Sequence, residues 1–147
     1  MSLGEIYFYT LAGLVSIFSF FIYLLVEDIK LFSIFKKMFL IAVIVLIIGT
    51  LLVFFDLSYW SNSKTIFIYS FPLIVLLLNR ALFLINNELF GEPFIYIKGG
   101  FLSGFWYRKV IDEKQITFLK WVYYAYCTIL HLSQIFLFST LFRKFFI

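Results

Sequence analysis

Charged residues, cysteine and proline are all scarce in this sequence. Of its 147 residues only 14% are charged, 2 are proline and 1 is cysteine, whereas 64% are hydrophobic. Soluble domains carry about 25% charged and roughly 45–50% apolar residues, so this chain has too few polar side chains to cover itself in water. The single Cys127 excludes a disulfide within one chain, and the hydrophobic content excludes intrinsic disorder. The composition therefore favours a small polytopic membrane protein.

The sequence also lacks the patterns of common catalytic and cofactor sites. One histidine and one cysteine cannot build a structural zinc site, and they exclude bis-histidine haem ligation within one chain. The chain has no Gly-rich phosphate loop, no G-x-S-x-G elbow, no H-E-x-x-H helix and no C-x-x-C pair. We therefore expect no cofactor and no metal, and an enzyme is the least supported class. The net charge of +4 fits loops that face anionic lipid and does not favour nucleic acid.

Long uncharged stretches predict four transmembrane helices. Residues 6–26, 38–55 and 121–142 contain no Asp, Glu, Lys or Arg, and residues 65–87 contain Arg80 alone. Each stretch approaches the roughly 20 residues that a helix needs to cross about 30 Å of hydrocarbon. We expect an all-α integral membrane protein in which residues 1–147 form one compact four-helix bundle with short loops. The expected spans are 6–26, 38–57, 65–87 and 117–142.

The distribution of basic residues predicts the orientation of the spans, because cytoplasmic loops carry an excess of Lys and Arg. The loops after the first and third spans hold Lys30, Lys36, Lys37, Lys98, Arg108, Lys109 and Lys114. The opposite side holds Lys64, Arg143 and Lys144. This asymmetry predicts both of these loops in the cytoplasm and both termini outside, as in a bacterial inner membrane. No basic residue precedes the first span and no cleavage site follows it, so we expect this span to be retained.

The segment 29–38, between the first two spans, has two interpretations. Its apolar residues fall on one helical face and its lysines on the other. It is either an amphipathic helix on the inner leaflet or the ends of the two neighbouring spans, with lysines that reach the headgroups.

The one substantial loop, residues 88–115, is predicted to be cytoplasmic. We expect any function specific to this protein to lie in this loop. Gly99 and Gly100 join two β-rich runs, 94–98 and 101–111, and permit the tight turn of a β-hairpin. An interfacial segment is the alternative. The loop also carries aromatic side chains next to basic residues. This combination fits either an interfacial aromatic belt or a partner-docking surface. The candidate partner-binding residues here are Phe105, Trp106 and Arg108.

Polar residues in the third span are a second candidate for partner binding, because polar groups at this depth are costly. Helical spacing places Asn79 with Asn86, and Arg80 with Asn87 and Glu88, on two neighbouring strips. Arg80 lies past the midplane, where it either extends to the inner headgroups or contacts a carboxylate, from a partner or from Glu88.

The fourth span carries the other row of polar residues. Tyr124, Thr128, His131 and Gln134, together with Cys127, recur at spacings of three and four and so share one helical face. This face is predicted to be either an interhelical hydrogen-bond seam or the lining of a pore.

Small residues in the first two spans predict close helix packing, and we assign them no site. They are Ala12, Gly13, Ser16, Ser19, Ala42 and Gly49.

In size, number of spans and Phe- and Ile-rich composition, the chain resembles the small membrane immunity proteins that protect bacteria from pore-forming toxins. The likeness covers size and composition and no alignable motif. It implies a protein that binds another membrane protein, as an immunity factor or an accessory subunit. The alternative function is a homo-oligomeric channel or pore-forming membrane effector lined by the fourth span.

Overall fold

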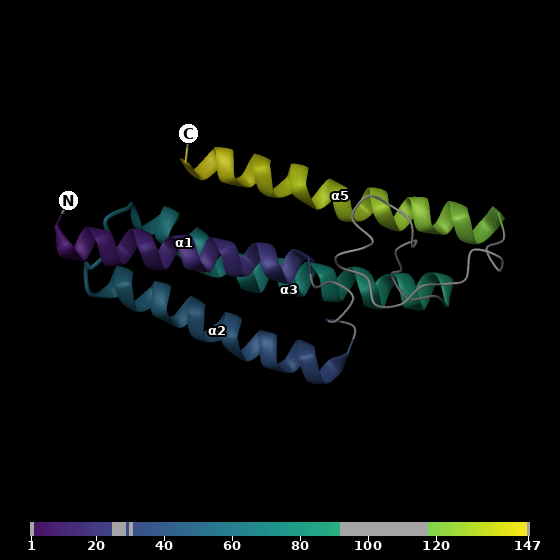
Figure 1. Cartoon of the computed structure of the whole chain (residues 1–147), viewed down its shortest axis with the longest axis horizontal. Helices are drawn as coiled ribbons and strands as arrows, with labels where there is room; N and C mark the ends of the chain where they lie inside the picture. Colours follow the sequence, from purple (N-terminus) through teal and green to yellow (C-terminus); the bar gives the residue numbers. More distant parts are fainter. Residues whose placement is uncertain (1, 25–28, 30, 92–117, 147) are drawn as a thin grey trace. The chain divides into compact units, whose positions relative to one another are not determined.

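A computed structural model describes residues 2–24, 29, 31–91 and 118–146 (Figure 1). In chain order its helices are α1 (Leu3–Leu24), α2 (Phe32–Phe54), α3 (Asn62–Phe90) and α5 (Phe118–Phe146). All four are long and apolar enough to cross a membrane, which confirms the expected four helical spans and is compatible with a membrane location. The described residues contain no strand. The hairpin expected in 94–111 lies outside the described residues, and the structure gives it no support.

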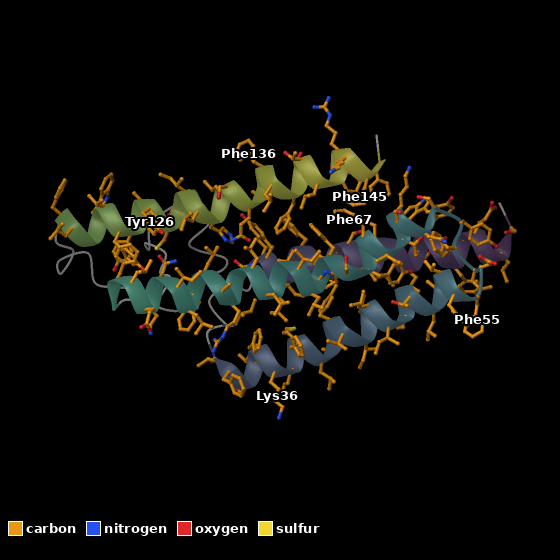
Figure 2. All side chains as sticks on the ribbon, turned by 180° about the vertical axis from the view of Figure 1, so that it is seen from behind. Lys36, Phe55, Phe67, Tyr126, Phe136 and Phe145 are labelled. Carbon is orange, nitrogen blue, oxygen red and sulfur yellow. The ribbon has the colours of Figure 1, made fainter. Side chains whose placement is uncertain are left out.

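The helix boundaries bear on the two interpretations of the segment 29–38. α2 begins at Phe32 and runs without interruption for 23 residues, so residues 32–38 form its first turns. No glycine or proline separates them from the rest of the helix, and long lysine side chains can reach the headgroup region from inside a span. Lys36 and Lys37 are exposed, and Figure 2 shows Lys36 extending away from the helices beside it. These residues are therefore continuous with α2 and do not form a separate helix, which favours the interpretation as the end of a span.

The chain divides into two units, Met1–Ala81 and Leu82–Ile147, which are described separately. In the first unit α2 runs back toward the start of α1, and α3 then reverses direction again (Figure 1). α1 begins with a capping box in which Glu5 N donates to Ser2 Oγ at 3.2 Å and Ser2 N donates to Glu5 Oε2 at 2.6 Å.

On α1 and α3 in the first unit, a row of buried side chains repeats at alternating spacings of three and four. This repeat keeps one face of each helix turned toward the interior. On α1 the buried row is Phe8, Ala12, Val15, Ser19 and Ile22. On α3 the row is Thr65, Ile68, Pro72, Val75 and Asn79. Pro72 therefore lies inside a long helix at a position that faces the interior.

α2 joins the first unit through small residues. Ala42 and Gly49 are its buried residues, two helical turns apart. A Cβ on Gly49 would overlap the Cβ and Cγ of Tyr69 on α3, so the glycine lets the base of the Tyr69 side chain pack directly against the backbone of α2. The predicted role of small residues in packing is confirmed for Ala12, Ser19, Ala42 and Gly49, whereas Gly13 and Ser16 are exposed.

The second unit contains the end of α3 and α5. The ring of Phe90 lies 5.3 Å from that of Tyr123 and 5.7 Å from that of Tyr126, so the last turn of α3 packs against the second turn of α5. Tyr126 in Figure 2 marks this contact, whereas Phe136, farther along α5, is 75% exposed and points away from it. The packing brings two of the predicted polar groups, the end of α3 and the start of α5, into one unit.

Candidate functional site

Arg80 connects three segments of the first unit. Its Nη1 donates to the backbone carbonyl of Ile29, 51 residues earlier, over 3.2 Å. Its Cζ lies 5.2 Å from the centre of the Phe35 ring on α2, within the range of a cation–π contact. The guanidinium is thus held between the α1–α2 connection, α2 and α3. These two contacts orient the planar guanidinium, the kind of group that pairs well with a carboxylate.

The polar residues of α3, predicted on neighbouring strips of one helical face, differ in burial. Asn79 and Asn86 are buried, and each side-chain amide donates to a carbonyl one turn back, Val75 O at 2.9 Å and Leu82 O at 2.7 Å. Arg80 is half-buried. Asn87 and Glu88, which belong to the second strip, are exposed. Asn87 and Glu88, in the second unit, therefore present polar atoms that another molecule can reach.

Two buried polar atoms in α3 have no hydrogen-bond partner among the described residues. They are the hydroxyl of Tyr69 and Oδ1 of Asn86. Tyr69 belongs to the first unit, where its Cβ end packs against Gly49, and Asn86 belongs to the second unit. Buried polar atoms without a partner cost about 1–3 kcal/mol each, so their presence inside the protein needs a physical reason.

The polar row of α5 is buried at four positions separated by three, four and three residues. These positions are Tyr124, Cys127, His131 and Gln134. Thr128 is only half-buried, because it stands one residue past Cys127 and therefore about 100° around the helix. Farther along α5 the same row continues with Phe138, Leu141 and Phe145, which are half-buried. The polar face is therefore confined to the first half of the helix.

Three of the expected partner-binding residues, Phe105, Trp106 and Arg108, lie outside the described residues. The prediction that they form a docking surface or an aromatic belt stays a prediction.

The described residues include an aromatic cluster that the sequence interpretation missed. Phe8 and Tyr9 on α1 contact Tyr59 and Trp60 in the connection between α2 and α3. The adjacent pair Tyr59 and Trp60 between two spans is the signal in the sequence that could have pointed to it. A second missed contact joins the hydroxyl groups of Ser58 and Thr65 at the start of α3.

Comparison with protein-family models, with curated proteins and with solved structures found no significant match.

Proposed function

We propose that the chain is a non-enzymatic membrane-spanning protein that binds another membrane protein. Its role is that of an immunity-type protector against a membrane-targeting toxin or of an accessory subunit of a larger complex. The partner-binding strip is the second strip of α3, Arg80 with Asn87 and Glu88, together with the loop residues Phe105, Trp106 and Arg108.

The geometry of Arg80 is the observation that carries this proposal. The carbonyl of Ile29 and the ring of Phe35 hold its guanidinium in one place, so binding a partner's carboxylate would order little additional side-chain freedom. In the second unit, Asn87 and Glu88 are exposed and supply a donor, an acceptor and a negative charge. A partner helix with complementary polar groups fits this strip, and the charges would set its register.

Co-purification from cells that naturally express the protein tests the proposal. Native mass spectrometry of the gently extracted protein measures the amount of companion protein per chain. The double variant Asn87→Ala with Glu88→Ala removes polar groups of the proposed partner-binding strip, so we expect it to retain less companion protein per chain. Both side chains are exposed, so their removal leaves the fold intact. Arg80→Leu and deletion of 94–111 are expected to reduce it further.

Matched controls separate a lost contact from a lost charge. Lys36→Ala and Lys37→Ala remove exposed charges from the start of α2, on the same predicted side of the membrane but outside the strip, and should leave the companion bound. Arg80→Lys keeps the charge and loses the planar fork that a carboxylate prefers. Undiminished association after Arg80→Leu combined with deletion of 94–111 would refute the proposal. The companion's identity decides between toxin and larger complex.

The polar row of α5 favours a second candidate function, a homo-oligomeric channel lined by this helix. Tyr124, His131 and Gln134 share one face, with Thr128 at its edge. The test is ion flux through purified protein in liposomes. A channel would give flux that His131→Ala alters and that Phe136→Ala, on an exposed side of α5, leaves unchanged. Absence of flux across a range of pH and voltage would exclude it.

A further inference from the structure

Four aromatic rings form a cluster where α1 begins and α2 ends. They belong to Phe8, Tyr9, Tyr59 and Trp60, and we call them the α1–loop ring cluster. The ring of Trp60 lies 5.2 Å from that of Phe8 and 5.6 Å from that of Tyr9, and Phe8 lies 5.7 Å from Tyr59. The angles between these ring planes range from 60° to 82°, which includes the edge-to-face arrangement that aromatic pairs prefer. The hydroxyl of Tyr59 also lies against Gly4, where a Cβ would collide with it. The cluster thus fastens the connection between α2 and α3 to the first turns of α1.

The connection that carries two of these rings has a defined backbone. Ser58 Oγ donates to Trp60 O at 2.9 Å, lies 3.3 Å from Trp60 N and bonds the hydroxyl of Thr65. Leu57 N donates back to Leu52 O at 2.9 Å, which closes the end of α2. Asp56 adopts a φ of 54°, a left-handed conformation that aspartate tolerates better than most residues. Side-chain bonds of this kind fix a turn without regular secondary structure, so the rings are presented in a set direction.

The outer side of the cluster is apolar and exposed. Tyr59 is 47% exposed, and Phe55 and Leu57 beside it are 61% and 58% exposed. Figure 2 shows Phe55 at this end of the first unit, pointing away from the helices. Asp56 is the one charged residue in the stretch 55–61. The exposed apolar sides of α1 and α2 continue onto this surface without an intervening run of charged residues.

We propose that the α1–loop ring cluster is a membrane-interface docking surface whose occupant is the lipid headgroup boundary, and that it sets the depth of the first unit in the bilayer. Tyr and Trp place an apolar ring against acyl chains and a polar tip among headgroups, and they concentrate at this depth. The flanking Phe55 and Leu57 would enter the acyl region, with Asp56 at the water side. The inference rests on the membrane placement in the proposed function and is independent of any partner.

Tryptophan fluorescence in phosphatidylcholine vesicles tests this surface. The variant Trp106→Phe with Trp121→Phe keeps Trp60 as the one tryptophan, and Trp60→Phe with Trp106→Phe keeps Trp121, an exposed residue at the start of α5. Each protein is placed in vesicles whose lipids carry a quencher either near the headgroup or deep in the acyl chain. We expect the shallow quencher to reduce Trp60 emission more than the deep quencher, with emission at shorter wavelength than that of tryptophan in water. Circular dichroism verifies that both variants remain helical.

The outcomes separate this surface from the function proposed above. If the lipid quenchers reduce the emission of Trp121 while only aqueous acrylamide reduces that of Trp60, the proposed docking surface is wrong. The proposal that the chain spans the membrane would still stand. Stronger quenching of Trp60 by the deep label would also overturn it, because the rings would then lie inside the hydrocarbon. Quenching of neither tryptophan by lipid would refute the membrane placement itself. If no companion protein is found while Trp60 is still quenched by the shallow label, the partner-binding proposal fails and the docking surface stands.

Discussion

Replacing three helical glycines by alanine, one at a time, is a sharp test of how α2 packs in the first unit. An added Cβ on Gly49 meets the Cβ and Cγ of Tyr69, which are fixed close to the backbone of α3. A Cβ on Gly4 meets only the hydroxyl end of Tyr59, which a flexible side chain can move aside. A Cβ on Gly13 meets nothing within 4 Å. We therefore expect Gly49→Ala to be the most destabilising of the three.

The magnitudes follow from two opposing effects. Alanine is about 1 kcal/mol better than glycine inside a helix, so Gly13→Ala stabilises the protein by up to that amount. Gly49→Ala has the same helix gain, but overpacking against Tyr69 costs about 1–3 kcal/mol. Because the helix gain is common to both variants, their difference of about 1–3 kcal/mol isolates the contact between α2 and α3. At about 2–4 °C per kcal/mol for a chain of this size, the two melting temperatures should differ by roughly 2–12 °C.

Thermal unfolding in mild detergent, followed by circular dichroism, measures this difference. Gly4→Ala should melt close to Gly13→Ala, because rotation of Tyr59 relieves its collision. Equal melting temperatures for Gly49→Ala and Gly13→Ala would refute the close approach of α2 to α3. A melting temperature of Gly4→Ala as low as that of Gly49→Ala would show that Tyr59 cannot move, and that the connection before α3 is more rigid than its side-chain bonds imply.

Three further substitutions test individual contacts by the same melting assay. Tyr69→Phe should leave stability unchanged or raise it by about 1–3 kcal/mol, because the buried hydroxyl of Tyr69 has no hydrogen-bond partner among the described residues. A clear loss of stability would show that this hydroxyl does make a hydrogen bond. Arg80→Gln should cost up to about 2 kcal/mol through the lost cation–π contact with Phe35, and no change would show that the ring contributes nothing. Thr65→Val should cost about 0.5–1.5 kcal/mol, since the bond between the hydroxyls of Ser58 and Thr65 is lost, and an unchanged melting temperature would contradict this bond.

The helical segments could be predicted from composition, but their ends could not. α2 begins at Phe32, six residues before the predicted start at Met38, and it includes Lys36 and Lys37, which the prediction places outside the span. A lysine can extend to the headgroups from within the first turns of a helix, so charge marks where the hydrocarbon ends and not where the helix ends. α3 likewise continues through Asn87 and Glu88 to Phe90, beyond the last apolar run.

The candidate site was predictable as helix faces and not as contacts. Spacing along α3 grouped Asn79 with Asn86 and Asn87 with Glu88, but only the structure shows that the first pair is buried and the second exposed. On α5 the buried position proved to be Cys127, with Thr128 at the edge of the face, because a difference of one residue turns a side chain by about 100°. The contact of Arg80 with the carbonyl of Ile29 spans 51 residues, and no local pattern indicates it.

The sequence by itself determined that this protein has four helices suited to a membrane. In lipid each apolar stretch of about 20 residues must satisfy its own backbone hydrogen bonds, and this requirement depends only on local composition. The tertiary structure alone decided which small residues are buried, so that Gly49 meets Tyr69 while Gly13 faces open space. It also decided what holds Arg80 and which four rings meet at the start of α1. A helical period defines the faces of a helix, but only the neighbouring helices determine which face is covered.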